Sequence, residues 1–310
     1  MKANQIISTW WSRANANWLG QTSEARRHRR ALGRTGMGIG RGVFLFGLSL
    51  VLLYPILIML SISMRTGAEM YDPTVIWIPK HITLHNFTTI WTELDIARSL
   101  MMSAIASIVS TVLQLISCII TGYGFARFDF PGRKLLFGIL LLMIIVPPQV
   151  VTIPSMMDFQ RFDFFGIGQL VGLFTGDPLT VSLRDNLIAY FLPALFGNGI
   201  KSGLFIFIFI QFFRGLPQEL QDAAYIDGCG KFRTFAVIMV PLAGAAILTV
   251  TLFSLVWYWN DSYFCVIHFD GLQTVSSFLQ NINEAVVSVS GGMQQIDRVP
   301  LTYAAAVLTI

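Results

Sequence analysis

The stretch GVFLFGLSLVLLYPILIMLSISM, from Gly42 to Met64, decides the class of fold. It contains no charged residue, and a helix needs about 20 such apolar residues to cross roughly 30 Å of hydrocarbon. The whole chain of 310 residues has the same character, since 54% of the residues are hydrophobic and 12% are charged. An ordinary soluble domain carries about twice that charged share. We therefore predict an all-α, polytopic membrane protein.

Four further apolar segments of spanning length follow the first, and a sixth begins near the end of the chain. We predict spans at residues 43–64, 100–126, 135–157, 187–213 and 241–267, with the sixth starting near Leu301. The sixth span reaches Ile310 after only ten residues, which is too short to cross. We expect that it is truncated at the C-terminus.

Basic residues are concentrated at the start of the chain. Eight of the 21 Lys and Arg residues lie in residues 1–41, which we predict to be a basic cytoplasmic tail ahead of a transmembrane domain at 42–310. This orientation places fourteen basic residues inside and seven outside, as the positive-inside rule favours. Because the tail accounts for the formal charge of +4, that charge does not predict nucleic-acid binding.

The patterns typical of metal, disulfide and nucleotide sites do not occur. Cys118, Cys229 and Cys265 lie far apart, and His81 and His85 lack the glutamate of a zinc-binding HExxH pattern. The phosphate-binding pattern GxxxxGK[ST] is missing too. We predict no metal, no catalytic residue and no cofactor in this chain.

The predicted cytoplasmic loop between spans four and five carries the most specific pattern. It reads LPQELQDAAYIDGCGKFRTFAVIMVPL from Leu216 to Leu242, and we call residues 216–241 the coupling segment. Pro217 suits the first position of a helix. Glu219 and Asp222 follow in the first turns, where carboxylates are stabilised by the helix dipole. We predict a first helix that begins at Pro217.

The first helix should end at Asp227 and Gly228, because glycine readily adopts the left-handed conformation of a C-cap. A second helix should then run to Pro241. Ala223 and Ala224 leave a low surface on the first helix, which allows another protein to approach closely.

This segment resembles the EAA loop of permease subunits of bacterial ABC importers. That pattern is an acidic residue, two alanines, three residues, a glycine, nine residues and Ile-x-Leu-Pro. The matching residues here are Asp222, Ala223, Ala224, Gly228, Ile238, Val240 and Pro241. Aspartate replaces glutamate and valine replaces leucine, and both replacements keep the chemical class.

Four weaker motifs resemble the carbohydrate branch of this family, specifically the smaller permease of maltose-type systems. They are WIPKHITLHNF (77–87), GYGFARFDFPGRK (122–134), VPPQVVTIP (146–154) and VWYWNDSYF (256–264). The resemblance implies the ABC importer permease fold, a bacterial plasma membrane, and transport of a sugar or oligosaccharide.

The resemblance also implies partners and a mechanism. A second permease would complete a heterodimer, two copies of an ABC ATPase would bind ATP and Mg²⁺, and an extracytoplasmic binding protein would deliver the solute. The coupling helix would dock on the ATPase through Glu219, Asp222, Ala223, Ala224, Asp227 and Gly228.

Five residues are candidates for contact with a transported sugar, because ligand sites combine apolar walls with a few polar groups. They are Trp257, Trp259, Asn260, Asn198 and Lys201. The same residues also fit a role at the lipid interface. The tryptophans can anchor there, and Gly197–Gly199 can break the helix and let Lys201 extend to the headgroups.

Two alternative functions remain open from the sequence. Permeases for polyamine or phosphate share the EAA pattern, so the solute can be something other than a sugar. An ion-coupled secondary transporter would show inverted repeats and buried carboxylates, and the sequence has no such repeat.

Overall fold

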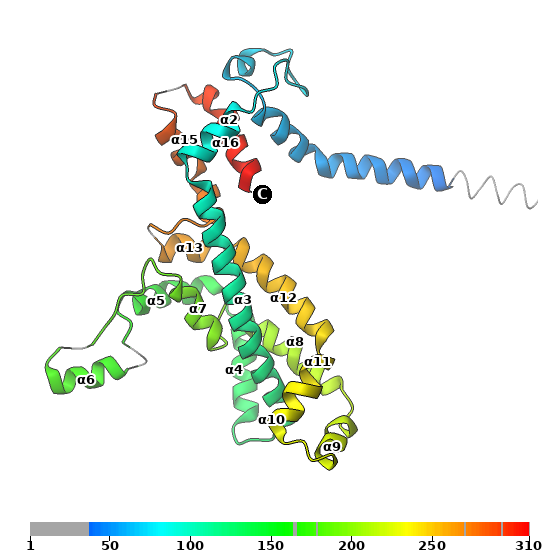
Figure 1. The fold of residues 1–310 in the computed structure, drawn as a ribbon, viewed down its shortest axis with the longest axis vertical. Helices are drawn as coiled ribbons and strands as arrows, with labels where there is room; N and C mark the ends of the chain where they lie inside the picture. Colours follow the sequence, from blue (N-terminus) through cyan, green and yellow to red (C-terminus); the bar gives the residue numbers. More distant parts are fainter. Residues whose placement is uncertain (1–36, 164–165, 178, 270, 293, 310) are drawn as a thin grey trace, which may run out of the picture. The chain divides into compact units, whose positions relative to one another are not determined.

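The computed structural model describes residues 37–163, 166–177, 179–269, 271–292 and 294–309 (Figure 1). The chain divides into two compact units, Met1–Ile62 and Ser63–Ile310. Most of the predicted basic tail, residues 1–36, lies outside the described residues, so the tail stays a prediction.

The first unit contains one long apolar helix, Met37–Ser63, which runs one residue into the second unit. No residue in the most apolar 18-residue stretch of this helix is buried, and Phe44 and Phe46 are 68% and 70% exposed. The predicted first span at 43–64 is confirmed, although the helix already includes Met37 to Arg41, which the sequence analysis assigned to the tail.

The second unit is built from helices, and no strand occurs among its described residues beyond one antiparallel bridge between Phe162 and Val181. Its elements are η1 (Gly67–Tyr71), α2 (His85–Glu93), α3 (Ile96–Arg127), α4 (Arg133–Ile145), α5 (Pro148–Gln160), α6 (Ile167–Thr175), α7 (Ile188–Leu195), α8 (Ser202–Gly215), α9 (Glu219–Ile226), α10 (Lys231–Arg233), the π-helical η2 (Thr234–Met239), α11 (Val240–Leu242), α12 (Gly244–Trp259), α13 (Tyr263–His268), α14 (Val275–Gln280), α15 (Ile282–Val289) and α16 (Gln295–Thr309).

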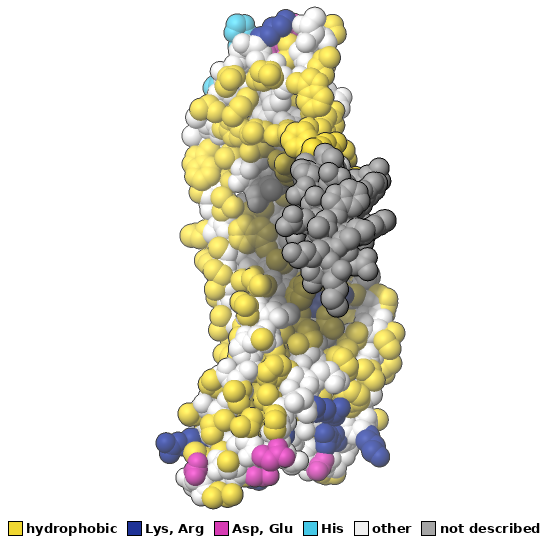
Figure 2. Space-filling view, turned by 90° about the vertical axis from the view of Figure 1, so that its right-hand side faces the viewer, with side chains coloured by type: hydrophobic (Ala, Val, Ile, Leu, Met, Phe, Trp, Pro, Cys, Tyr) yellow, Lys and Arg dark blue, Asp and Glu magenta, His cyan; other side chains and the backbone are white. Residues whose placement is uncertain are grey.

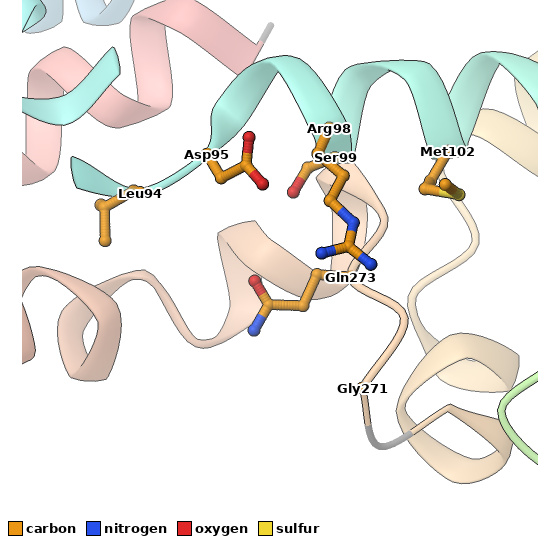
Figure 3. Close-up of a pocket in the computed structure, with 7 residues that line it drawn as sticks. All are labelled: Leu94, Asp95, Arg98, Ser99, Met102, Gly271 and Gln273. Atoms are coloured by element: carbon orange, nitrogen blue, oxygen red, sulfur yellow. The ribbon is translucent and has the colours of Figure 1, made fainter. Parts of the chain in front are cut away.

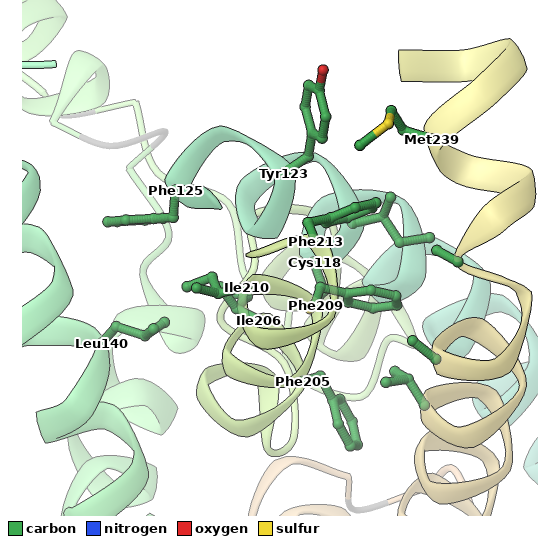
Figure 4. Packing of buried hydrophobic residues seen from close by; sticks show 14 residues of the cluster. Cys118, Tyr123, Phe125, Leu140, Phe205, Ile206, Phe209, Ile210, Phe213 and Met239 are labelled. Atoms are coloured by element: carbon green, nitrogen blue, oxygen red, sulfur yellow. The ribbon is translucent and has the colours of Figure 1, made fainter. Parts of the chain in front are cut away.

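Helix α3 is the central element of the second unit, and α7, α8 and α12 pack against it (Figure 1). The main hydrophobic cluster lies where α3 meets α8 (Figure 4). Phe205, Phe209 and Phe213 recur every four residues along α8 and are fully buried, as expected for one face of a helix. Helix α3 runs from Ile96 to Arg127 and is long and apolar enough to cross a membrane, so the predicted span at 100–126 is confirmed within a longer helix.

The predicted third span, residues 135–157, is not one helix. Helices α4 and α5 are bent by 101° at Val146 and Pro147. Pro147 and Pro148 cause the break, because proline has no N–H to donate and keeps the residue before it extended. The predicted third span is therefore a bent pair of helices, which together are long and apolar enough to count as one broken span.

The predicted fourth and fifth spans are also interrupted. Residues 196–201 separate α7 from α8, with left-handed backbone at Gly197 and Lys201. The fifth begins earlier than predicted, as helix Lys231–Leu242, bends by 73° into α12, and ends at Trp259 rather than at residue 267. Two of the described helices are long and apolar enough to cross a membrane, or up to four spans if each bent pair counts as one. The total of six spans stays a prediction.

The stretches between the apolar segments contain short helices that the sequence analysis did not predict. Helix α6 lies in the stretch 158–186, and α14 and α15 occupy much of residues 268–300. Helix α16 starts at Gln295, six residues before Leu301, and packs against α2 and η1.

Close approach of α3 and α8 depends on Gly122. A Cβ atom there would lie 2.5 Å from the Cβ atom of Phe209, whereas one on Gly124 would meet nothing within 4 Å. Gly122→Leu should lower the free energy of unfolding by about 1–3 kcal/mol through overpacking, seen as a lower thermal midpoint in detergent. Gly124→Leu is the matched control, and equal midpoints for the two variants would contradict this packing.

Candidate functional site

The coupling segment lies at the end of the second unit where α3 and α8 end and α4 begins (Figure 1). Figure 2 shows Lys, Arg, Asp and Glu side chains gathered at this end, with hydrophobic side chains over much of the surface beyond it. Helix α9 starts at Glu219, two residues after the predicted start at Pro217, because Gln218 forms the preceding turn. Apart from this shift, the first helix is where the sequence predicts it.

Helix α9 is joined to α3 by a residue that sequence analysis did not single out. The Gln221 amide Nε2 donates to the hydroxyl of Tyr123 on α3 at 3.1 Å and to that of Tyr225 at 2.7 Å. Gln221 and Ala224 are buried, so they form the inner face of α9. The only signal for Gln221 in the sequence is its position one residue before the Asp-Ala-Ala run.

The outer face of α9 consists of exposed residues, and it includes Glu219, Asp222, Ala223 and Asp227. Of the two predicted docking alanines, only Ala223 is therefore accessible to a partner, because Ala224 is 3% exposed. Helix α9 ends as predicted, with Asp227 N–H bonded to the Ala223 carbonyl and Gly228 at φ 78°.

Two predicted pathway residues come together at the break between α7 and α8. The Lys201 ammonium lies 5.0 Å from the centre of the Trp257 ring, within the range of a cation–π contact. Trp257 is 44% exposed, so the pair lies at the surface of this chain. Lys201 itself adopts φ 59°, which confirms that the helix is interrupted here.

The other predicted pathway residues do not join this pair in a hydrogen-bonded site. Asn198 is exposed in the break, and its backbone N–H bonds to the carbonyl of Pro193. Asn260 follows the last residue of α12 and is exposed, and its side chain donates to the Val256 carbonyl at 2.9 Å. Trp259 is partly buried on α12. Their contacts within the described residues do not assign these three residues to a pathway.

Gln114 on α3 forms hydrogen bonds with the backbone and side chains around the break. It is fully buried, and its Nε2 donates to the Ile200 carbonyl and to the Ser202 hydroxyl, both at 2.7 Å. Its Oε1 accepts from Ser254 of α12 at 2.8 Å, and Ser254 also contacts Thr111. One amide therefore joins α3, the start of α8 and α12.

Tyr258 of α12 makes a second contact with the backbone of the break. The Tyr258 hydroxyl accepts from the Ile200 N–H at 3.3 Å. A Cβ atom at Gly199 would lie 2.4 Å from that hydroxyl oxygen, so a larger residue would displace Tyr258. Sequence analysis gave this end of α12 a pathway or lipid-interface role and did not predict that Tyr258 is buried, because an apolar helix hides which of its faces is buried.

A polar pocket of about 240 Å³ lies at the start of α3, and sequence analysis did not predict it (Figure 3). Its polar lining comes from Asp95, Arg98 and Ser99 on one side and Gln273 on the other. The Arg98 side chain extends from α3 toward the segment that holds Gln273 (Figure 3). The pocket offers both hydrogen-bond donors and acceptors at the end of α3 opposite the coupling segment.

Residues 114–310 match the family model described as the binding-protein-dependent transport system inner membrane component. This match covers part of α3 and all of α4 to α16. The chain belongs to this family. It is therefore a multi-pass membrane protein and a permease component of a transport system.

Related permeases are about a quarter to a third identical to this permease over the aligned residues. The arabinooligosaccharides transport system permease protein AraQ of Halalkalibacterium halodurans is 30% identical over 217 residues, covering 69% of each chain. The diacetylchitobiose uptake system permease protein NgcG of Streptomyces coelicolor is 27% identical over 213 residues, covering 69% of this chain and 63% of NgcG.

The fold is also similar to that of a chain in a solved ABC transporter. A chain of the bacterial ABC transporter involved in import of the acidic polysaccharide alginate superposes with a TM-score of 0.67 at 19% identity. The superposition covers 88% of this permease and 91% of that chain. The predicted ABC importer permease fold is confirmed.

The Gln114 contacts lead to a stability prediction. Gln114→Leu keeps a similar volume but removes the hydrogen bonds that Gln114 makes to the Ile200 carbonyl and to the buried hydroxyls of Ser202 and Ser254. An unsatisfied buried polar group costs about 1–3 kcal/mol, so the thermal midpoint of the purified permease should fall. Gln114→Glu keeps an acceptor for Ser254 but removes the two donated bonds, and it should also be less stable than the wild type.

The control for this measurement is Gln149→Leu, at an exposed glutamine in the first turn of α5. An equal midpoint for Gln114→Leu and the wild type would show that Gln114 does not hold the break together.

Proposed function

We propose that this permease and a second permease subunit form the translocation pathway of an ATP-driven importer for a sugar or oligosaccharide. The family match over residues 114–310 carries the proposal, because it includes the whole coupling segment. AraQ and NgcG are named for the uptake of carbohydrates, and the solved fold neighbour is part of an alginate importer. These names support a sugar as the solute.

The exposed face of α9 supports a docking role for the coupling segment. Large apolar side chains lie uncovered around it, with Ile226 87% and Phe232 80% exposed. Burying one such side chain stabilises a complex by about 1.5–3 kcal/mol. We infer that the ATPase subunit covers this surface, with Asp222 and Ala223 at the contact.

The hydrogen bond from Gln221 to Tyr123 supports mechanical coupling. A displacement of α9 by the ATPase would act directly on α3 through this contact. Helix α3 packs against α7, α8 and α12, so it is placed to pass the movement to the helices that surround the break. ATP and Mg²⁺ would bind to the ATPase, and this permease would need no cofactor and perform no catalysis.

The complete importer, as we propose it, contains a permease heterodimer, two ATPase copies and an extracytoplasmic binding protein in a bacterial plasma membrane. A further alginate ABC transporter chain with a similar fold, at a TM-score of 0.58 and 13% identity, comes from a complex with a pentasaccharide-bound periplasmic protein. That complex supports the proposed class of partner. The N-terminus and the coupling segment would both face the cytoplasm.

Trp257 and Lys201 are the pathway residues that we favour for contact with the solute. Their cation–π pair presents an aromatic ring and an ammonium at one position on the surface. Trp259, Asn260 and Asn198 remain proposed pathway residues on the basis of sequence alone.

Purification from the native host tests this function. A tagged permease in mild detergent should recover an ATPase and a second permease, and the reconstituted assembly should take up a labelled oligosaccharide when ATP is supplied. Uptake of spermidine or phosphate in place of every sugar would contradict the proposed solute. An intact preparation without an ATPase would contradict the importer.

A bulky residue on the exposed face of α9 tests the coupling role. Ala223→Trp should reduce ATP-dependent uptake at least about tenfold, because losing about 1.4 kcal/mol of docking free energy is enough for that change and the added ring separates α9 from the ATPase. Ala223 is exposed, so membrane insertion and thermal stability should not change. Ala223→Ser is the matched control and should retain uptake. Normal uptake by Ala223→Trp would disprove docking through this face.

A further inference from the structure

A second pocket lies at the same end of the unit as the coupling segment, but on the α3–α4 connection. Its volume is about 680 Å³, within the roughly 300–1,000 Å³ typical of ligand sites. It is lined by Asp129, Phe130, Gly132, Arg133, Lys134, Leu135, Phe137 and Arg214. Three cations and three large apolar side chains therefore share one concave surface.

The charges of this pocket are not balanced within the described part of the chain. Arg133 forms an ion pair with Asp129. Lys134 and Arg214 have no ion pair with any described residue. Arg214 instead lies over the Phe137 ring, with its guanidinium carbon 5.6 Å from the ring centre. The pocket consequently carries an excess of two positive charges.

The apolar lining continues directly into a helix face that no described part of the chain covers. Helix α4 begins at Arg133, and only Leu140 among its thirteen residues is buried. Leu135, Ile139 and Leu142 are 71%, 45% and 57% exposed. In a membrane protein such a face lies against acyl chains. Because α4 begins at Arg133, the basic residues of the pocket lie at the start of this exposed apolar face.

We propose that this pocket binds an anionic phospholipid of the cytoplasmic leaflet. Its phosphate would lie between Lys134 and Arg214, and its acyl chains would follow Leu135 and the exposed face of α4. Basic pockets between membrane helices on the cytoplasmic side recognise anionic headgroups in this way. The proposal rests on the orientation proposed above, with the α3–α4 connection in the cytoplasm, and it is independent of the transported solute.

Such a lipid would act at a defined position in the fold. Arg214 lies at the end of α8, and the coupling segment begins two residues later. A headgroup that joins Arg214 to Lys134 would fix the end of α8 against the start of α4. Anionic lipid content should therefore affect how firmly the coupling segment is held.

Lipid retention by the full-length permease, together with any subunits that co-purify, tests the proposal. Native mass spectrometry would count bound phosphatidylglycerol and phosphatidylcholine added separately to the protein in detergent. Each basic residue near an anionic surface contributes about 1 kcal/mol, which is about fivefold in binding. Lys134→Gln with Arg214→Gln should therefore weaken phosphatidylglycerol binding about 25-fold, and phosphatidylcholine binding should not change.

The matched control removes two charges from the same end of the protein but outside the pocket. Lys231 and Arg233 are exposed and do not line it. Lys231→Gln with Arg233→Gln should retain phosphatidylglycerol within about twofold of the wild type, because charges outside the pocket act only through the screened surface potential. An equal loss in both double variants would overturn the pocket in favour of general surface charge.

Lipid binding by a single variant and recovery of the ATPase are two further measurements. Lys134→Gln alone changes one exposed side chain, so it should fold normally and bind phosphatidylglycerol about fivefold more weakly. Wild-type retention by this variant and by the double variant would overturn the proposal. Retention of the lipid with loss of the ATPase would instead identify a protein-docking surface. Because no transport is measured, failure of the importer assay would be a separate result.

Discussion

Inside a membrane, every backbone N–H and C=O group must find a partner within the protein, because lipid offers none. This constraint governs the break between α7 and α8. Helix α8 has fourteen residues and covers about 21 Å, which is less than the hydrocarbon thickness of about 30 Å. Where lipid surrounds such a break, its non-helical backbone needs side-chain partners. Gln114 and Tyr258 supply them for Ile200, from helices on two sides of the break.

The same constraint explains why α3 carries so many polar residues on its buried face. Ser103 accepts from the backbone N–H of Val275, and Ser117 donates to the Ala194 carbonyl of α7. Gln114 completes the series at the break. Helix α3 is thus a continuous spanning helix that supports its interrupted neighbours. Small side chains such as Gly122 let those neighbours approach closely enough for these contacts.

The two ends of the second unit have different chemistry. The end with the coupling segment combines an exposed acidic and apolar face on α9 with a basic pocket beside α4. Each feature fits a different neighbour, a protein for the former and a lipid headgroup for the latter. The opposite end of α3 offers a small mixed polar pocket around Arg98. Partners at the two ends can therefore act on the same long helix.

Much of this organisation was predictable because it depends on local chemistry. The apolar runs predicted a membrane protein, since their length matches the bilayer, and Gly228 predicted the end of α9. The spacing from Asp222 to Pro241 indicated the permease family before any fold was known. Gly197 and Gly199 also indicated the break between α7 and α8, because glycine readily leaves the helical conformation.

The sequence alone thus determined the class of protein, the coupling segment and the break at Gly197–Gly199. Tertiary structure decided which side chains form hydrogen bonds with the backbone at the break, and which face of α9 is exposed. Gln114 and Ile200 are 86 residues apart, and Gln221 and Tyr123 are 98 apart, so no local pattern links them. Ala223 and Ala224 are adjacent and identical in chemistry, yet only Ala223 is exposed. That difference arises solely from the packing of α9, because burial is a property of the neighbours that a residue meets in the folded chain.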